Sequence, residues 1–174
     1  MRDSFGRRAA AVLRHYPVAR YGGDGAIAWS AVFTDRIWAC SQVTTGNTLA
    51  RFVPVYSYDF ADMHAQPLAP LPEGFPAGAS HGSELPNLFN VAGLRPITSS
   101  YYTSQQRRLA ATMIDYWTSF ARTGHPDSPA GPPWPVTRPG HAEQPALQLA
   151  PGPDGIRPTD AAAEHQCAFW RAIS

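Results

Sequence analysis

Apolar residues recur at helical spacing near the start of the chain. Phe5, Ala9, Val12 and Tyr16 follow one another at intervals of three or four residues, which is the period of one face of an α-helix. Pro17 disfavours the helical conformation in the residue before it, so the predicted helix ends at Tyr16.

The strongest strand pattern covers residues 52–60. These residues are mainly aromatic or β-branched and alternate between two sides, which is typical of a strand. The following segment, 61–80, is rich in Pro and Gly and has no apolar period. A loop of this length is unusual inside a compact domain and is often functional. We therefore expect residues 61–80 to be a long loop with a role of its own.

A long amphipathic helix is predicted over residues 104–122. Thr103 and Gln106 have the spacing of a capping box, and Gly124 stands where a helix commonly ends in the left-handed conformation. The apolar stripe of this helix consists of Leu109, Met113, Tyr116, Trp117 and Phe120. The rest of the chain is predicted to form a Pro-rich connector over 125–139, a short strand over 146–150 and a final helix over 160–172.

Composition narrows the class of protein. With 174 residues, 44% hydrophobic and 16% charged, the chain is too apolar to be disordered and can bury one ordinary core. Fourteen scattered arginines face thirteen acidic residues, and the net charge of +1 supports no nucleic-acid role. No apolar run approaches the roughly 18 residues of a membrane span. With no internal repeat, we expect residues 1–174 to be one domain or one piece of a domain.

The N-terminus and the cysteines bear on the compartment. The apolar stretch 9–13 is interrupted by Arg14 and is too short for a secretory signal, so we expect no signal peptide in this chain. Cys40 and Cys167 lie far apart and lack the spacing of metal ligands. Two buried thiols and one long-range disulfide both remain open on these facts, and only the disulfide implies an oxidising compartment.

Among the six histidines, His81 has a distinct context. No pair of histidines has a metal-binding helical spacing, so neither a metal site nor a cofactor is predicted. His81 follows the long loop and is flanked by Gly78 and Gly82. α/β-hydrolases present their general base on such a loop after a core strand. A surface histidine without a function is the alternative at this point.

Ser80 matches a nucleophile motif in an unsuitable context. Gly78, Ser80 and Gly82 have the G-x-S-x-G spacing, but that motif exposes its serine only where a strand runs in and a helix leaves. Pro72 and Pro76 precede Ser80 closely and disfavour a central strand there. Ser80 is therefore a weak candidate nucleophile.

Seven short motifs follow one another along the chain in a recognisable order. They occupy residues 12–17, 33–40, 55–60, 78–89, 116–126, 134–135 and 167–170. Together they resemble the type B carboxylesterase family, the group of cholinesterases and bacterial para-nitrobenzyl esterases. The resemblance covers nearly the whole chain but only the C-terminal third of the family's domain. Asn87, Ser119 and His125 depart from the residues usual in the family.

The resemblance implies an α/β fold, namely the C-terminal portion of an α/β-hydrolase. Late parallel strands, a histidine loop, a long packing helix and a C-terminal helix are its expected parts. It implies that His81 is the acid–base of a catalytic triad and that Glu84 supports the hydrogen bonds of the same loop, although Glu84 could equally be a solvated acid. It also implies a disulfide between Cys40 and Cys167, which favours export of the intact parent.

The nucleophile, the triad acid and the oxyanion-hole loop precede this portion in the family. Candidate acids before His81 are Asp24, Asp35, Asp59 and Asp62, and none has the family's motif. We therefore expect this chain to be the C-terminal part of a serine esterase that acts on a carboxylic-ester substrate. Activity would require the N-terminal part, so we expect the isolated chain to be inert. One alternative is a non-catalytic esterase-like binding module, since family members without a working triad act in adhesion. The other is a compact esterase using Ser80, Asp115 and His141.

Overall fold

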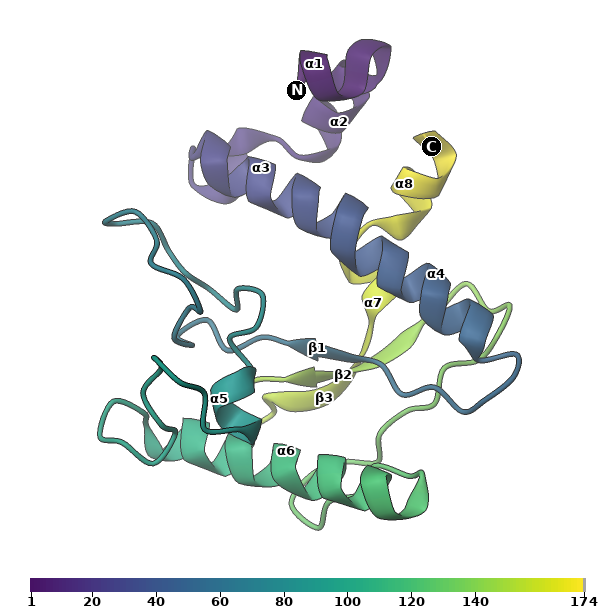
Figure 1. The fold of residues 1–174 in the computed structure, drawn as a ribbon. Helices are drawn as coiled ribbons and strands as arrows, with labels where there is room; N and C mark the ends of the chain where they lie inside the picture. Colours follow the sequence, from purple (N-terminus) through teal and green to yellow (C-terminus); the bar gives the residue numbers. More distant parts are fainter. Residues whose placement is uncertain (174) are drawn as a thin grey trace. The chain divides into compact units, whose positions relative to one another are not determined.

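The computed structural model describes residues 1–173, whose helices and strands form two compact units (Figure 1). The first unit combines residues 1–53 and 138–144 with the chain from residue 160 onward. The second unit combines residues 54–137 and 145–159. Each unit brings together segments that are distant in the sequence, so each depends on tertiary contacts.

The first unit is helical. Its elements are α1 (Arg2–Phe5), the 3₁₀ turn η1 (Gly6–Arg8), α2 (Ala9–His15), the 3₁₀ turn η2 (Val18–Tyr21), α3 (Gly25–Phe33), the π-helical η3 (Thr34–Ala39), α4 (Cys40–Leu49), α7 (Ala161–Glu164) and α8 (Cys167–Ile173). The side chain of Asp24 caps α3 by accepting from the backbone N–H groups of Ala26 and Ile27. From there α3, η3 and α4 run on as one long helix (Figure 1).

A small core holds these helices together. Its buried members come from α2, the long helix and the C-terminal helices, and they are Val12, Tyr16, Val32, Cys40, Ala162, Cys167 and Trp170. The predicted N-terminal helix is present, but it is interrupted at Gly6, where φ is +49°. It ends at His15 with Tyr16 as its C-cap, immediately before Pro17, as the sequence predicted.

The second unit is built on a three-stranded sheet in the order β1-β2-β3. Its elements are β1 (Tyr58–Phe60), α5 (Leu85–Leu88), α6 (Ser104–Thr123), β2 (Pro145–Leu149) and β3 (Ile156–Asp160). β1 and β2 are parallel, with Tyr58 opposite Leu147 and Phe60 opposite Leu149. The connection 150–155 is too short for a crossover, so β3 returns antiparallel to β2.

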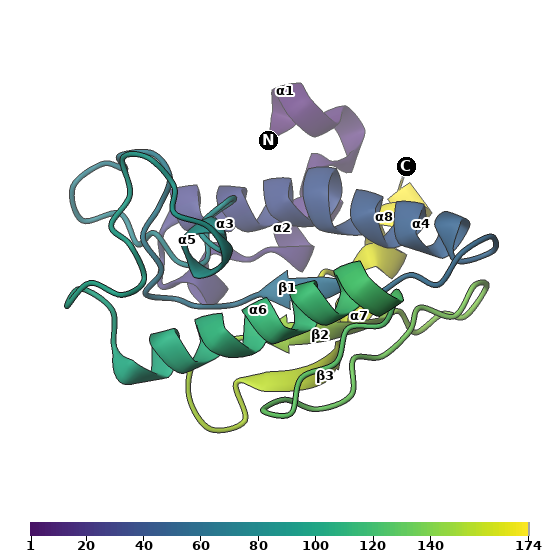
Figure 2. The same ribbon diagram turned by 60° about the horizontal axis from the view of Figure 1, so that its bottom comes forward.

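Helix α6 confirms the predicted amphipathic helix. Thr103 and Gln106 form both hydrogen bonds of the capping box, and Gly124 ends the helix in the left-handed region with φ +76°. The apolar stripe of α6 packs against the sheet (Figure 2). The buried residues of this core are Leu109, Met113, Tyr116, Trp134, Leu147 and Leu149.

The prediction of a strand over residues 52–60 was largely wrong. Only Tyr58–Phe60 forms a strand, preceded by an isolated bridge between Tyr56 and Val136. The backbone N–H groups of Phe52 and Val53 both bond to the carbonyl of Leu49, so these residues continue the helical turn at the end of α4. Both side chains are largely exposed, Phe52 at 80% and Val53 at 53%, so the local hydrogen bonds of the helical turn outweighed their β-propensity.

Two further predictions need correction. The final helix expected over 160–172 is two helices, because Gln166 adopts φ +54° and breaks the helix between α7 and α8. The sequence analysis also gave no helix over residues 25–49 and no strand at β3. The strand expected over 146–150 is present as β2, and residues 61–80 contain neither helix nor strand, as expected.

Candidate functional site

His81 lies on a tight turn of the second unit. The loop 61–80 leaves the carboxyl end of β1, and the N–H of Ser83 then donates to the carbonyl of Ser80 at 2.9 Å, closing the turn around His81. Gly82 has φ +81°, and a Cβ placed there would lie 2.0 Å from Cδ1 of Leu68. The turn therefore requires glycine after the histidine, both for its backbone conformation and for the packing of Leu68.

His81 is exposed to solvent, and α5 begins four residues after it. Glu84 is half-buried and directly precedes α5. Burial raises the pKa of Tyr58 on β1, and the charge of Glu84 raises it further. The carboxylate of Glu84 thus acts on the strand from which the histidine loop departs.

Two of the second unit's buried hydroxyl groups without a hydrogen-bond partner lie on this turn. Within residues 1–173 the hydroxyls of this kind are Ser80 Oγ, Ser83 Oγ, Ser99 Oγ and Tyr102 OH. Ser83 is only 2% exposed, so its hydroxyl is also removed from bulk solvent. A buried hydroxyl that is left unsatisfied destabilises a fold by roughly 1–3 kcal/mol.

Ser80 lacks the surroundings of a nucleophile elbow. No strand occurs between residues 61 and 79. The Oγ of Ser80 is buried and has no hydrogen-bond partner, so neither Asp115 nor a histidine activates it. Asp115 lies in the C-terminal half of α6 and instead accepts a hydrogen bond from the Ser128 hydroxyl at 3.2 Å. The geometry therefore offers Ser80 no general base.

The carboxylates of three candidate acids, Asp24, Asp35 and Asp62, accept hydrogen bonds that stabilise the fold. Asp24 caps α3. Asp35 accepts hydrogen bonds from the Tyr16 hydroxyl and from Nδ1 of His165, both at 2.8 Å. Asp62 accepts from Nε2 of Gln106 at 2.8 Å. Each of these carboxylates holds part of the fold in place.

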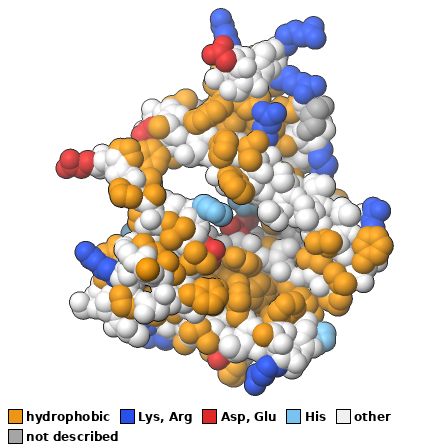
Figure 3. All heavy atoms as spheres, in the orientation of Figure 1, with side chains coloured by type: hydrophobic (Ala, Val, Ile, Leu, Met, Phe, Trp, Pro, Cys, Tyr) orange, Lys and Arg blue, Asp and Glu red, His pale blue; other side chains and the backbone are white. Residues whose placement is uncertain are grey.

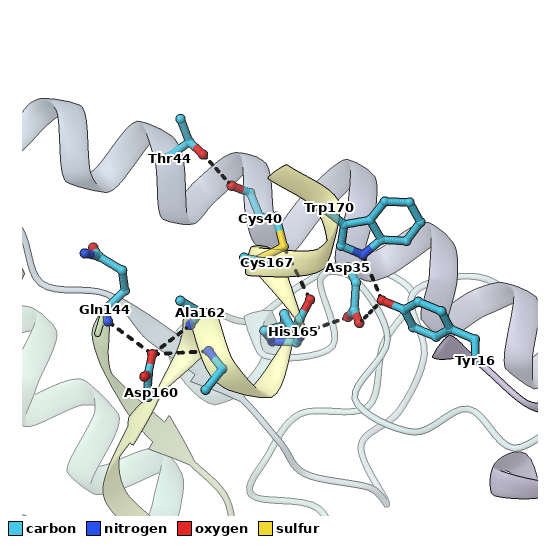
Figure 4. Close-up of a disulfide and its surroundings, with 11 residues drawn as sticks. Tyr16, Asp35, Cys40, Thr44, Gln144, Asp160, Ala162, His165, Cys167 and Trp170 are labelled. Atoms are coloured by element: carbon cyan, nitrogen blue, oxygen red, sulfur yellow. Dashed lines mark hydrogen bonds and ion pairs between the residues drawn. A yellow bond between two sulfur atoms is a disulfide. The ribbon is translucent and has the colours of Figure 1, made fainter. Parts of the chain in front are cut away.

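The predicted pairing of Cys40 with Cys167 is present as a disulfide within the first unit (Figure 4). Beside it lies a buried polar network that sequence reasoning missed: Trp170 donates to the hydroxyl of Tyr16 at 2.8 Å, and Tyr16 donates to Asp35. Burial, together with Asp35, raises the pKa of Tyr16 well above its ordinary value. The members of this polar network are up to 154 positions apart in the sequence, so no local sequence pattern connects them.

The second unit also carries an aromatic hollow of about 180 Å³. It is lined by Tyr56, Tyr58, Tyr116, Trp117, Phe120, Pro126 and Trp134. The polar groups of three rings form hydrogen bonds within the unit. Tyr116 OH donates to the carbonyl of Pro132, and Trp134 Nε1 donates to the carbonyl of Ser57. Tyr56 OH is hydrogen-bonded to Nδ1 of His125. The hollow therefore exposes ring surface rather than polar groups.

Within residues 1–173, no three His, Cys, Asp or Glu side chains are grouped so that they could hold a metal ion. No described helix has both the length and the apolar character needed to cross a bilayer.

Comparison with known proteins gives a consistent picture. A profile described as the carboxylesterase family matches residues 14–170. Human neuroligin-2 is 38% identical over 104 residues, which cover 57% of this chain and 12% of that protein. Mouse neuroligin-3 is 36% identical over 104 residues, with the same shares. The matched region thus spans about an eighth of the length of these curated relatives.

Proposed function

Because this chain belongs to the carboxylesterase family, we propose that it supplies the general acid–base histidine, His81, to a serine carboxylic-ester hydrolase. The observation that carries this proposal is the place of His81, exposed on a tight turn after the loop that leaves the carboxyl end of β1. Open α/β sheets bind their ligands beyond the carboxyl ends of the strands, so an imidazole there can reach a bound ester.

In this proposal the His81 imidazole accepts the proton of a serine hydroxyl as that oxygen attacks the ester carbonyl. The same imidazole then returns the proton to the departing alcohol. We expect the serine, the triad acid and the oxyanion donors to come from a part of the protein outside these 174 residues. Without them neither an acyl-enzyme nor a stabilised oxyanion forms, so the isolated chain is expected to be inert.

Glu84 is proposed to support the histidine loop rather than to react. Its backbone carbonyl accepts from the backbone N–H and the side-chain amide of Asn87, at 3.0 and 3.2 Å, at the start of α5. Its charge acts on Tyr58 of β1. Only the charge depends on the identity of residue 84, and it favours a supporting role beside β1.

The test begins with the reading frame upstream of the Met1 codon. If that frame is open and encodes a G-x-S-x-G elbow, the longer protein should be expressed and assayed with a simple aryl ester. His81→Ala should then lower kcat by at least about a hundredfold. His64→Ala is the matched control, because His64 is another exposed histidine of the same loop region. Equal activity of the His81→Ala and parent proteins would refute the catalytic role of His81.

The isolated chain gives the complementary test. It should hydrolyse the aryl ester no faster than its own His81→Ala variant. Hydrolysis by the isolated chain that is lost in Ser80→Ala would support the compact esterase with Ser80 as nucleophile, and would overturn the proposal that the chain is inert.

A specific observation favours the alternative of a non-catalytic binding module. Large apolar side chains of the long helix in the first unit are exposed, namely Trp29, Phe33, Ile37 and Trp38 at 38–48%. Figure 3 shows apolar side chains at the surface over α3. Exposed apolar surface of this kind commonly marks a protein-protein contact. An upstream frame closed by a stop codon near Met1, with no hydrolysis, would favour this alternative over the esterase.

A further inference from the structure

We propose that Asp62 is a positioning residue for His81. Its buried carboxylate, held by the side-chain amide of Gln106, fixes the start of the loop 61–80 to the N-terminal end of α6. Through the residues that follow Asp62, this hydrogen bond sets the place of the turn that carries His81. The inference rests on the function proposed for His81, but the hydrogen bond can be tested without any esterase activity.

The carboxylate of Asp62 is almost completely removed from solvent, with 2% of the residue exposed. One oxygen accepts from Nε2 of Gln106 at 2.8 Å, and the other accepts from the backbone N–H of His64 at 2.9 Å. A buried carboxylate is tolerated only with such donors, and removing one of them leaves a strongly unfavourable group behind. Asp62 is therefore a firm anchor and not an incidental contact.

The orientation of Gln106 is fixed by the capping box. Its Oε1 accepts from the backbone N–H of Thr103 at 2.9 Å and from the Thr103 hydroxyl at 3.1 Å. With the oxygen occupied in this way, the amide nitrogen must face Asp62. The Gln106 side chain thus caps α6 and also donates a hydrogen bond to the start of the loop 61–80.

Packing transmits the position of Asp62 to the histidine turn. Cε of Met63, the next residue, lies 3.4 Å from the place a Cβ would take at Gly78. Leu68 lies closer still to Gly82, where an added Cβ would overlap its Cδ1. Side chains of the segment 63–68 therefore lie beside both glycines that flank His81. A shift of this segment must move or loosen the turn.

A reversal of the hydrogen-bond polarity tests the link. In Asp62→Asn, the new amide nitrogen faces either Nε2 of Gln106 or the backbone N–H of His64, and both of these are donors. In Gln106→Glu, the new carboxylate faces the carboxylate of Asp62. Each single variant therefore loses the bond. The double variant Asp62→Asn/Gln106→Glu restores the bond with its polarity reversed. The amide nitrogen at position 62 donates to the carboxylate at position 106, which still accepts from Thr103. The amide oxygen at position 62 still accepts from the N–H of His64.

The readout is the NMR signal of the His81 imidazole in the 174-residue chain, assigned through its loss in His81→Ala. Each single variant should shift or broaden this signal and lower the thermal midpoint of unfolding. The double variant should return both to parental values. Tyr16→Phe is the control, because it breaks a buried hydrogen bond of the first unit and should lower the thermal midpoint without moving the His81 signal.

Two results would overturn the proposal. Single variants that lower the thermal midpoint but leave the His81 signal unchanged would make Asp62 a merely structural residue. A double variant that fails to restore the signal would show that the Asp62–Gln106 bond does not carry the effect. If the single variants do not fold, the double variant carries the test, and a folded double variant whose His81 signal differs from the parental one overturns the proposal.

The same variants separate this inference from the proposed function. In a longer, active protein the single variants should lower kcat with little change in KM, and the double variant should restore kcat. If His81→Ala leaves hydrolysis unchanged, the proposed function fails. The NMR result then still decides whether Asp62 positions the turn.

Discussion

The two units treat their buried polar groups differently. In the first unit, Asp35 has two hydrogen-bond donors, and Tyr16 both donates to it and accepts from Trp170. In the second unit, all four buried hydroxyls without a partner in the described chain lie between Ser80 and Tyr102. The first arrangement is that of a structural frame. The second combines paired groups, such as Asp62 and Gln106, with hydroxyls that have no partner within the described chain.

The backbone explains part of this difference. The polar network of the first unit is presented by helices, and a disulfide joins α4 to α8 beside it (Figure 4). The histidine turn follows a long segment without helix or strand. Its position depends on a few side chains, with Asp62 among them.

The largest effect is expected from removing the disulfide. Cys40 and Cys167 are 127 positions apart, so the cross-link restricts the unfolded chain strongly. The double variant Cys40→Ser/Cys167→Ser should lose about 5 kcal/mol of unfolding free energy, measured by urea denaturation. A reducing agent should destabilise the parent similarly and leave the double variant unchanged. A loss near zero would show that the first unit does not depend on its covalent tie.

A matched pair of substitutions compares the two units directly. Tyr16→Phe removes a hydroxyl that donates to a carboxylate and should lower the unfolding free energy by about 2 kcal/mol. Tyr102→Phe removes a hydroxyl that is equally buried but has no partner, and should leave stability unchanged or raise it by about 1 kcal/mol. Urea denaturation measures both. Equal losses would mean that the contrast between the units is absent in solution.

The pH dependence of the same pair provides a control. The pKa of Tyr16 is raised in the folded chain, so its contribution to stability is complete below the ordinary tyrosine pKa of about 10. The contribution is lost as the pH rises above that value, because the unfolded chain then ionises first. The stability difference between the parent and Tyr16→Phe should therefore shrink in alkaline solution.

The smallest effect concerns Glu84. Burial raises the pKa of Tyr58 first, and the negative charge of Glu84 adds to it because a phenolate beside a carboxylate is unfavourable. Glu84→Gln should therefore lower the pKa of Tyr58 while leaving it above the ordinary value. NMR titration of the Tyr58 ring measures the shift. An unchanged pKa would remove the physical link between Glu84 and β1.

Local signals in the sequence were reliable where one segment decides its own structure. The capping box of Thr103 and Gln106 predicted the start of α6, and Gly124 predicted its end. The Pro- and Gly-rich composition predicted that residues 61–80 form no regular element. Ordered motifs predicted the family and the pairing of Cys40 with Cys167. The roles of His81 and Glu84 remain predictions from those motifs.

Long-range contacts decided the rest. The bond from Gln106 to Asp62 spans 44 positions, and the network of Tyr16, Asp35 and Trp170 spans still more. The sequence alone determined the ends of α6 and the family, because these depend on neighbouring residues. Only the tertiary structure decided which buried polar groups find partners, because that depends on segments that meet after the chain has folded.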